Sequence, residues 1–166
     1  MKKRGKRNFF QKINWGILFL SLLTVYGTSL LGSLFTSPGV KSFWYLTVRP
    51  SITPPDIVFP IVWNILFFLI FISLYISLTT AKNKKESSKV EIVFGINFLL
   101  NFLWSFFFFG LRNPLFGFLD LILLFFSIIA MIKITWKINR KASWLLVPYL
   151  LWIIFAGLLN YLSLFR

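Results

Sequence analysis

Five long apolar runs, separated by short polar connections, dominate the hydrophobic pattern of this 166-residue chain. They cover residues 15–35, 57–78, 92–111, 115–136 and 144–165, and each contains 20 to 22 residues. At about 1.5 Å per helical residue, each run is long enough to span the ~30 Å hydrocarbon core of a bilayer. The pattern therefore predicts an all-α membrane protein, a bundle of five transmembrane helices forming a single domain over residues 1–166.

Positive charges are distributed unevenly among the connections between these runs. Fourteen of the 18 Lys and Arg residues lie before the first run, in the second connection, or in and near the fourth connection. Those fourteen are Lys2, Lys3, Arg4, Lys6, Arg7, Lys12, Lys82, Lys84, Lys85, Lys89, Lys133, Lys137, Arg140 and Lys141. Positive residues favour the cytoplasmic side, so we expect a cytoplasmic N-terminus and an external C-terminus. Because the charges lie between membrane spans, the excess of 14 positive charges does not indicate nucleic-acid binding.

Composition removes several classes of chemistry. The chain has no cysteine, no histidine and four acidic residues, which leaves few groups for nucleophilic, acid–base or metal chemistry. We expect no catalytic residue, no metal site and no cofactor. The composition, 58% hydrophobic with 22 Phe and seven Trp, exceeds what a soluble domain of this size could bury and indicates an integral membrane protein.

The connection at residues 36–56 is the longest and is a candidate lid on the outer side. Its end, in the stretch RPSITPPDIVFP, reads as a capping box with Thr53 as N-cap, Pro54 at the first helical position and Asp56 at the third. Pro60 would then bend the second helix, because it lacks the backbone N–H of an interior position. Simple helix punctuation explains the same residues without a lid.

Tryptophans fall into two groups by depth. Trp15, Trp44, Trp136 and Trp144 lie at span ends, as interfacial residues do. Trp63, Trp104 and Trp152 lie deeper, where an indole N–H needs a partner.

Helical periodicity adds polar residues to the deep group. Asn97, Asn101, Trp104 and Phe108 share one face of the third span, and Tyr149, Trp152, Ala156, Asn160 and Ser163 share one face of the fifth. Asp120 is the one acid within a span and should face the protein interior. The sequence thus predicts either an aromatic cavity for a planar hydrophobic ligand or polar and aromatic packing between helices.

Three blocks of sequence resemble the TspO/MBR family, the tryptophan-rich sensory and translocator (peripheral-type benzodiazepine receptor) proteins. They are RPSITPPDIVFPIVW, LLNFLWSFFFFGLRNP and PYLLWIIFAGLLNY. The resemblance implies a dimeric five-helix receptor that binds porphyrins, sterols or benzodiazepine-type drugs in a pocket covered by the first outer loop. It implies a location in a bacterial plasma membrane.

The resemblance assigns pocket or lid roles to Pro54, Trp63, Phe67, Asn101, Trp104, Trp152 and Ala156. A weak sterol-recognition pattern is met by Leu159, Tyr161 and Arg166. Three places depart from the family pattern: Ile52 and Phe67 stand where Trp and Tyr are common, and Ser105 and Phe106 follow Trp104 where proline is common.

We expect a membrane protein that binds a porphyrin or a similar planar molecule. Light-dependent porphyrin breakdown by Trp63 and Trp152 is the one enzymatic activity that the resemblance suggests. A porphyrin or sterol transporter is the alternative, although the chain shows no inverted repeat and no break within a helix on its cytoplasmic side.

Overall fold

The computed structural model of the protein describes residues 13–166. Five helical segments in this part are long and apolar enough to cross a membrane, as the hydrophobic pattern predicts. The first six predicted cytoplasmic charges, Lys2 to Lys12, lie outside the described residues. The remaining eight follow the predicted partition, at the ends of α3 and α5 and the beginnings of α4 and α6; we call this the Lys-rich end and the opposite end the lid end.

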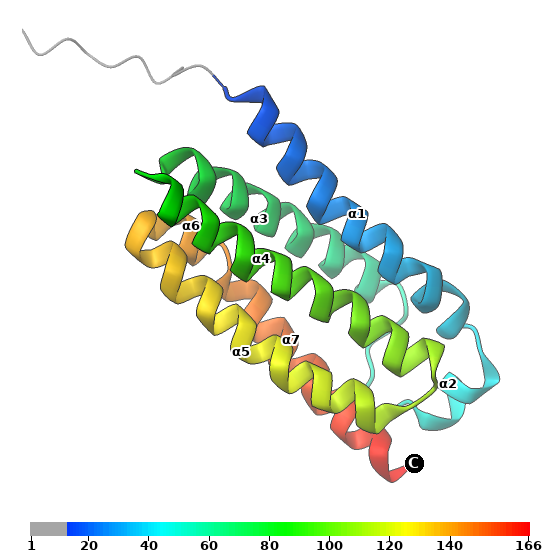
Figure 1. The fold of residues 1–166 in the computed structure, drawn as a ribbon. Coiled ribbons are helices and arrows are strands. Elements are labelled where there is room, and N and C mark those ends of the chain that lie inside the picture. Colours follow the sequence, from blue (N-terminus) through cyan, green and yellow to red (C-terminus); the bar gives the residue numbers. More distant parts are fainter. Residues whose placement is uncertain (1–12) are drawn as a thin grey trace, which may run out of the picture.

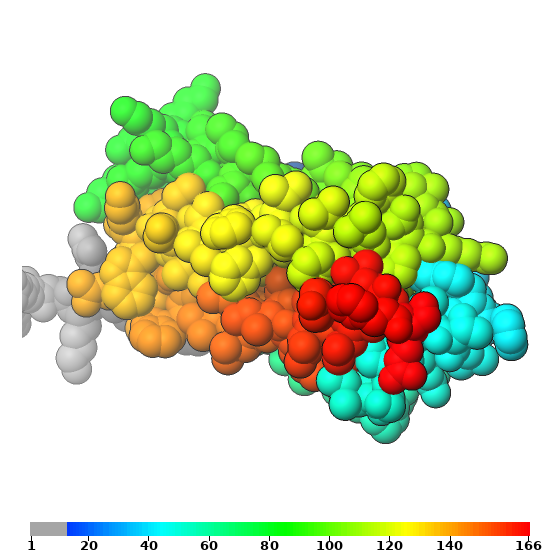
Figure 2. Space-filling model, turned by 90° about the horizontal axis from the view of Figure 1, so that it is seen from below, coloured from blue at the N-terminus to red at the C-terminus, as the bar shows by residue number. Residues whose placement is uncertain are grey.

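The helices are arranged as a bundle (Figure 1). Their bounds are α1 Trp15–Gly39, α2 Phe43–Val48, α3 Val58–Thr80, α4 Lys84–Ser105, a π-helical turn η1 Phe106–Gly110, α5 Pro114–Ile138, α6 Arg140–Trp144, α7 Val147–Leu162 and a 3-10 turn η2 Ser163–Phe165. Helix α1 packs against α3 and α4, α4 packs against α5, and α5 packs against α7. Figure 2 shows α5 and α7 side by side, with the C-terminal residues beside the region of α2.

Asparagine caps set the starts of several helices. The side-chain oxygens of Asn14, Asn83, Asn113 and Asn139 each accept a backbone N–H from the first turn that follows. The cap at Asn83 starts α4 at Lys84, eight residues before the predicted 92. Glu86 also accepts the backbone N–H of Lys82 at 2.8 Å, so an Asn-x-x-Glu signal for this start was present in the sequence.

The predicted connection at residues 36–56 is partly helical. Helix α1 continues to Gly39, and the six-residue helix α2 forms behind its cap Ser42. We call residues 40–57, which include α2, the lid. The predicted capping box is wrong: α3 begins at Val58 without a side-chain cap. Pro60 therefore lies in the first turn, where the missing N–H breaks no helical hydrogen bond and gives no reason for a bend.

The packed core fills the half of the bundle near the Lys-rich end. Its most buried members come from every long helix and include Val25, Ile70, Phe94, Ile128 and Tyr149, none more than 1% exposed. In the lid half, Tyr45 of the lid packs on Phe108 and Phe109, and the three rings form a smaller buried aromatic cluster. The space between these two clusters holds the candidate site.

Candidate functional site: an aromatic cavity under the lid

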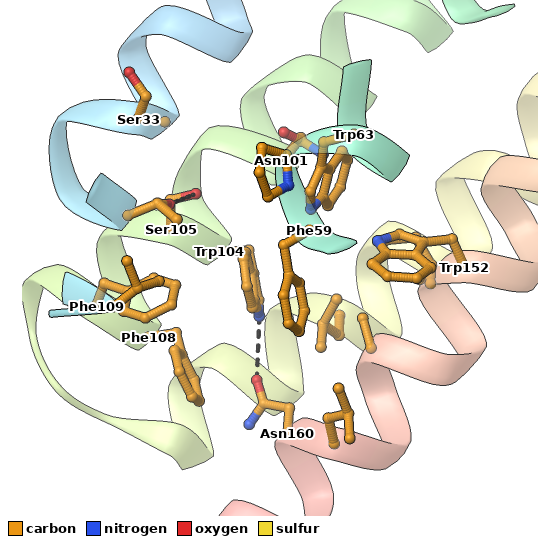
Figure 3. A pocket seen from close by; sticks show the side chains of 18 of the residues that line it. Ser33, Phe59, Trp63, Asn101, Trp104, Ser105, Phe108, Phe109, Trp152 and Asn160 are labelled. Atoms are coloured by element: carbon orange, nitrogen blue, oxygen red, sulfur yellow. Dashed lines mark hydrogen bonds between the residues drawn. The ribbon is translucent and has the colours of Figure 1, made fainter. Parts of the chain in front are cut away.

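A cavity of about 380 Å³ lies among α1, α3, α4, α5 and α7, with the lid at its outer end. Residues 50, 53 and 56 of the lid line it, together with side chains from all five long helices. Figure 3 shows Trp63, Trp104 and Trp152, from three different helices, arranged around this space. The deep tryptophans therefore face a common interior.

Helix α3 forms one aromatic wall. Trp63 stacks on Phe67 one turn further along, with ring centroids 5.3 Å apart and planes inclined by 29°. Phe59 meets Trp152 of α7 edge to face at 5.9 Å. These positions recur every four residues, so the helical repeat alone directs Phe59, Trp63 and Phe67 to the same side. The Phe59–Trp152 contact closes the cavity between α3 and α7.

The opposite wall is built on Trp104 of α4. Its ring lies nearly parallel to that of Phe108, at 14° and 5.5 Å. The Trp104 Nε1–H donates to Asn160 Oδ1 at 3.1 Å, and Asn160 Nδ2 donates to the carbonyl of Pro114 at 2.7 Å. A Cβ at Gly117 would lie 2.9 Å from Asn160 Oδ1, so glycine at this position makes room for the amide. The indole is thus held by a polar chain across three helices.

The π-helical turn η1 shapes the part of this wall that is nearest the lid. The backbone N–H of Leu111 bonds the carbonyl of Phe106, five residues back. Phe108 and its neighbour Phe109 are both buried and contact Tyr45 of the lid. Such single π-turns are often found at functional sites. The turn brings two consecutive rings under the lid.

A buried hydrogen-bond chain forms the polar part of the cavity floor. Asn101 Nδ2 donates to the Tyr149 hydroxyl at 3.1 Å, and that hydroxyl donates to Asn97 Oδ1 at 3.3 Å. Asn97 Nδ2 then donates to Ser127 Oγ at 2.8 Å. Of this chain, Asn101 alone lines the cavity. Its side-chain oxygen makes no hydrogen bond to any described residue and is available to a ligand.

The lid is held by one ion pair and by buried aromatic contacts. Arg49 Nη1 and Asp56 Oδ1 are 3.3 Å apart, on side chains that are 40% and 62% exposed. Tyr45 is buried against Phe108 and Phe109. Burial, followed by the nearby Asp56 carboxylate, raises the pKa of Tyr45 above its ordinary value, while Arg49 opposes this effect. The Tyr45 phenol therefore stays neutral under the lid.

Most of the residues that the family resemblance assigns to the pocket or lid are found on the cavity wall. Trp63, Phe67, Asn101, Trp104, Trp152 and Ala156 all line the cavity, whereas Pro54 lies in the lid without lining it. The sterol pattern does not converge on one surface. Leu159 lines the cavity, Tyr161 is 44% exposed beside Phe118 and Phe165, and Arg166 is exposed.

Two single-residue expectations have different outcomes. Asp120 faces the interior as predicted: it is 3% exposed, and its Oδ2 has no hydrogen-bond partner among the described residues. It does not line the cavity. Trp44, expected at the membrane interface, is partly buried and packs edge to face on Phe108 at 5.4 Å, and its depth in the membrane stays a prediction. Trp44 belongs to the aromatic cluster below the lid because α2 turns it inward.

Sequence reasoning missed several cavity residues. Phe59, Phe109 and Tyr45 carry no distinguishing signal among so many aromatic residues, although the i, i+4 spacing from Trp63 could have indicated Phe59. The small residues that α1 contributes were missed entirely. They are Ser29, Gly32, Ser33, Thr36 and Ser37.

Comparison with known proteins gives concordant matches. The model of the TspO/MBR family matches residues 19–165. Tryptophan-rich protein TspO of Chlorobaculum tepidum is 42% identical over 131 residues, covering 78% of this chain and 82% of the relative. Tryptophan-rich protein TspO of Archaeoglobus fulgidus is 43% identical over 145 residues, covering 87% and 92%. Protein CrtK of Rhodobacter capsulatus is 33% identical over 131 residues, covering 78% and 79%.

Proposed function

This chain belongs to the TspO/MBR family, and we propose that this integral membrane protein is a receptor for a planar, lipid-soluble ligand of the porphyrin class. The ligand would occupy the cavity under the lid. By binding the ligand in this way, the protein senses or sequesters it. The observation that carries the proposal is the convergence of three indoles from α3, α4 and α7 on one cavity.

The cavity suits a flat conjugated molecule. Its volume of about 380 Å³ falls in the range of ligand pockets, roughly 300–1,000 Å³. Aromatic faces on opposite sides, Trp63 with Phe67 and Trp104 with Phe108, offer stacking surfaces. A planar ring system can contact both walls without adjusting its own shape.

A few polar groups would orient the edge of the ligand. Trp104 has its N–H engaged by Asn160, whereas Trp63 and Trp152 make no N–H hydrogen bond to a described residue. Together with the free oxygen of Asn101, these two indoles offer two donors and one acceptor. This small set fits a mostly apolar molecule with a few hydrogen-bonding atoms.

An equilibrium titration tests the proposal. Protoporphyrin IX added to the detergent-solubilised protein should quench tryptophan fluorescence saturably. Trp152→Ala or Trp63→Ala should raise Kd by about tenfold, because each removes a stacking surface worth ~1 kcal/mol or more. Trp144→Phe, at a 62% exposed residue outside the cavity, is the matched control. Unchanged Kd in both cavity variants contradicts binding at this site.

Three further parts of the proposal need their own measurements. We place the protein in the plasma membrane, and the charge partition favours an orientation with the N-terminus in the cytoplasm, which labelling of either terminus in intact cells would test. Chemical cross-linking in membranes would test the homodimer. Movement of porphyrin across the membrane of proteoliposomes would distinguish a transporter from a receptor. Formation of porphyrin breakdown products under illumination would show photodegradation.

A further inference from the structure

The cavity walls differ in how completely they are closed. Between α3 and α7, the rings of Phe59 and Trp152 meet. Between α4 and α7, Trp104 and Asn160 are hydrogen-bonded. The wall between α1 and α3 lacks any comparable contact: among the described residues, no hydrogen bond or aromatic pair joins residues 29–37 to residues 58–65. No interaction of either kind therefore closes the cavity between α1 and α3.

Small side chains from α1 form this side. All five α1 helical residues on the cavity are Ser, Thr or Gly, and α3 contributes Pro60 and Asn64 to the same lining. Of the helical residues that line the cavity, Ser33, Ser37, Pro60 and Asn64 are also exposed on the molecular surface, as is Asp56 of the lid. A residue that meets both conditions lies where the cavity reaches the surface. We call this opening, lined by Ser29, Ser33, Ser37, Pro60 and Asn64, the α1–α3 slot.

The path of α1 explains the slot. Near the Lys-rich end, α1 meets α3, where the backbone N–H of Asn14 donates to the Tyr75 hydroxyl at 3.3 Å. Near the lid end, α1 meets α4 and η1 instead: Thr36 donates to Ser105 at 3.2 Å, and Gly39 lies against the Phe109 ring. Because α1 crosses from one neighbour to the other, it diverges from α3 at the depth of the cavity.

The slot opens within the membrane-spanning part of the molecule. Ser33 precedes the end of α1 by six residues, or roughly 9 Å along the helix axis. Its surroundings on the outside are exposed apolar residues such as Leu30 and Leu34, which lipid chains cover in a membrane. The opening thus connects the cavity with the hydrocarbon layer below the lid.

We propose that the ligand passes between the bilayer and the cavity through the α1–α3 slot, without displacement of the lid. This inference rests on the proposed function. It narrows the ligand class to molecules that dissolve in the membrane and carry hydrogen-bonding atoms on one edge. The side-chain oxygens of the slot can meet that edge: Asn64 donates its amide N–H to the Pro60 carbonyl at 2.8 Å, which leaves its own oxygen free as an acceptor. Hydroxyl groups at such an opening can hydrogen-bond the polar atoms of the ligand and so lower the free-energy cost of moving them out of water or headgroups through an apolar boundary.

Single cysteines test this route because the chain has none of its own. Ser33→Cys would be reacted with a bulky maleimide in liposomes, and protoporphyrin IX would be delivered from the lipid phase in a stopped-flow instrument. Labelling should slow association at least about tenfold, a barrier increase of ~1.4 kcal/mol. Labels at Leu34→Cys, 67% exposed on the same helix, and at Thr47→Cys, exposed on the lid, should change the rate less than about twofold.

The dissociation rate separates an obstructed entrance from an occupied cavity. A blocked path slows entry and exit by the same factor, so Kd stays constant. A label that raises Kd without slowing association, or a Thr47→Cys label that slows binding while the Ser33→Cys label does not, overturns the inference.

A second readout is independent of porphyrin. Phospholipids with brominated acyl chains quench indoles that they reach. The quenched fraction of emission should fall in Trp63→Phe relative to the unsubstituted protein, because Trp63 lies on the cavity wall next to the slot. No difference shows that lipid does not reach Trp63 and contradicts the open slot. Absent porphyrin quenching with intact bromolipid quenching would contradict the proposed function and leave the slot supported.

Discussion

The two halves of the bundle use the same helices in opposite ways. Near the Lys-rich end, side chains from all five long helices pack around Val25, Phe94 and Ile128. Near the lid end, the same helices diverge around an aromatic cavity. Polar groups differ correspondingly: Asn97 and Ser127 are paired deep in the bundle, whereas Asn101 presents a free oxygen to the cavity. The solid half is thus a rigid base that positions a half built for binding.

Replacement of a core residue should have the largest effect on stability. Phe94 is 1% exposed, and Phe94→Ala should lower the free energy of unfolding by about 3 kcal/mol, because it leaves a void in the solid half. Unfolding in SDS would measure this change. Ile96→Ala, at a 51% exposed residue of the same helix, should have little effect. A similar loss in both variants would contradict the assignment of the solid core.

A glycine pair on α1 tests how tightly the lid end is packed. A Cβ at Gly39 would clash with the Phe109 ring, whereas nothing lies within 4 Å of a Cβ at Gly27. Gly39→Ala should therefore destabilise the protein by about 2 kcal/mol through overpacking, and Gly27→Ala should be neutral or slightly stabilising. Both are measured by SDS unfolding. Equal stability of the two variants would show that α1 does not approach η1 this closely.

The polar chain at the boundary between the halves should contribute less. Tyr149→Phe removes one hydroxyl and both of its hydrogen bonds, a loss of about 1 kcal/mol within a membrane. It also frees Asn101 to turn, so porphyrin Kd should change several-fold. Tyr161→Phe, at an exposed position, is the control. A Tyr149→Phe protein with unaltered stability and Kd would mean that this chain does not orient Asn101.

The ion pair of the lid should contribute least. Arg49 and Asp56 are both largely exposed, so Arg49→Ala should change the free energy of unfolding by less than about 1 kcal/mol, and less still at high salt. A double-mutant cycle with Asp56→Ala isolates the pair. A coupling energy well above this value would show that the ion pair, and not the buried Tyr45 cluster, holds the lid closed.

Periodicity alone predicted the general arrangement. The spans, the interior position of Asp120 and the common depth of Trp63, Trp104 and Trp152 all follow from run length and helical spacing. These features depend on a side chain's own helix, which the local sequence specifies.

Features that depend on tertiary contacts were not predictable in the same way. The helical propensities of Phe106–Phe109 do not distinguish an α-helical turn from the observed π-turn. In the structure, this turn packs against Tyr45 and Gly39. The start of α3 is at Val58 and not at Pro54: the backbone N–H of Thr53 bonds the carbonyl of Pro50 in a turn, and Asp56 pairs with Arg49. The Thr53 side-chain oxygen caps no helix and has no hydrogen-bond partner among the described residues. Small residues such as Ser33 give no chemical signal until a neighbouring helix diverges from them.

Fluorine NMR of protein labelled with 5-fluorotryptophan tests the central claim most directly. The seven indoles give separate signals that can be assigned by single Trp→Phe variants. Bound protoporphyrin IX should shift the signals of Trp63, Trp104 and Trp152 through its ring current and leave those of the exposed Trp15, Trp136 and Trp144 in place. Shifts confined to the exposed indoles, or no shift at any cavity indole at saturating ligand, would contradict a binding site in the cavity.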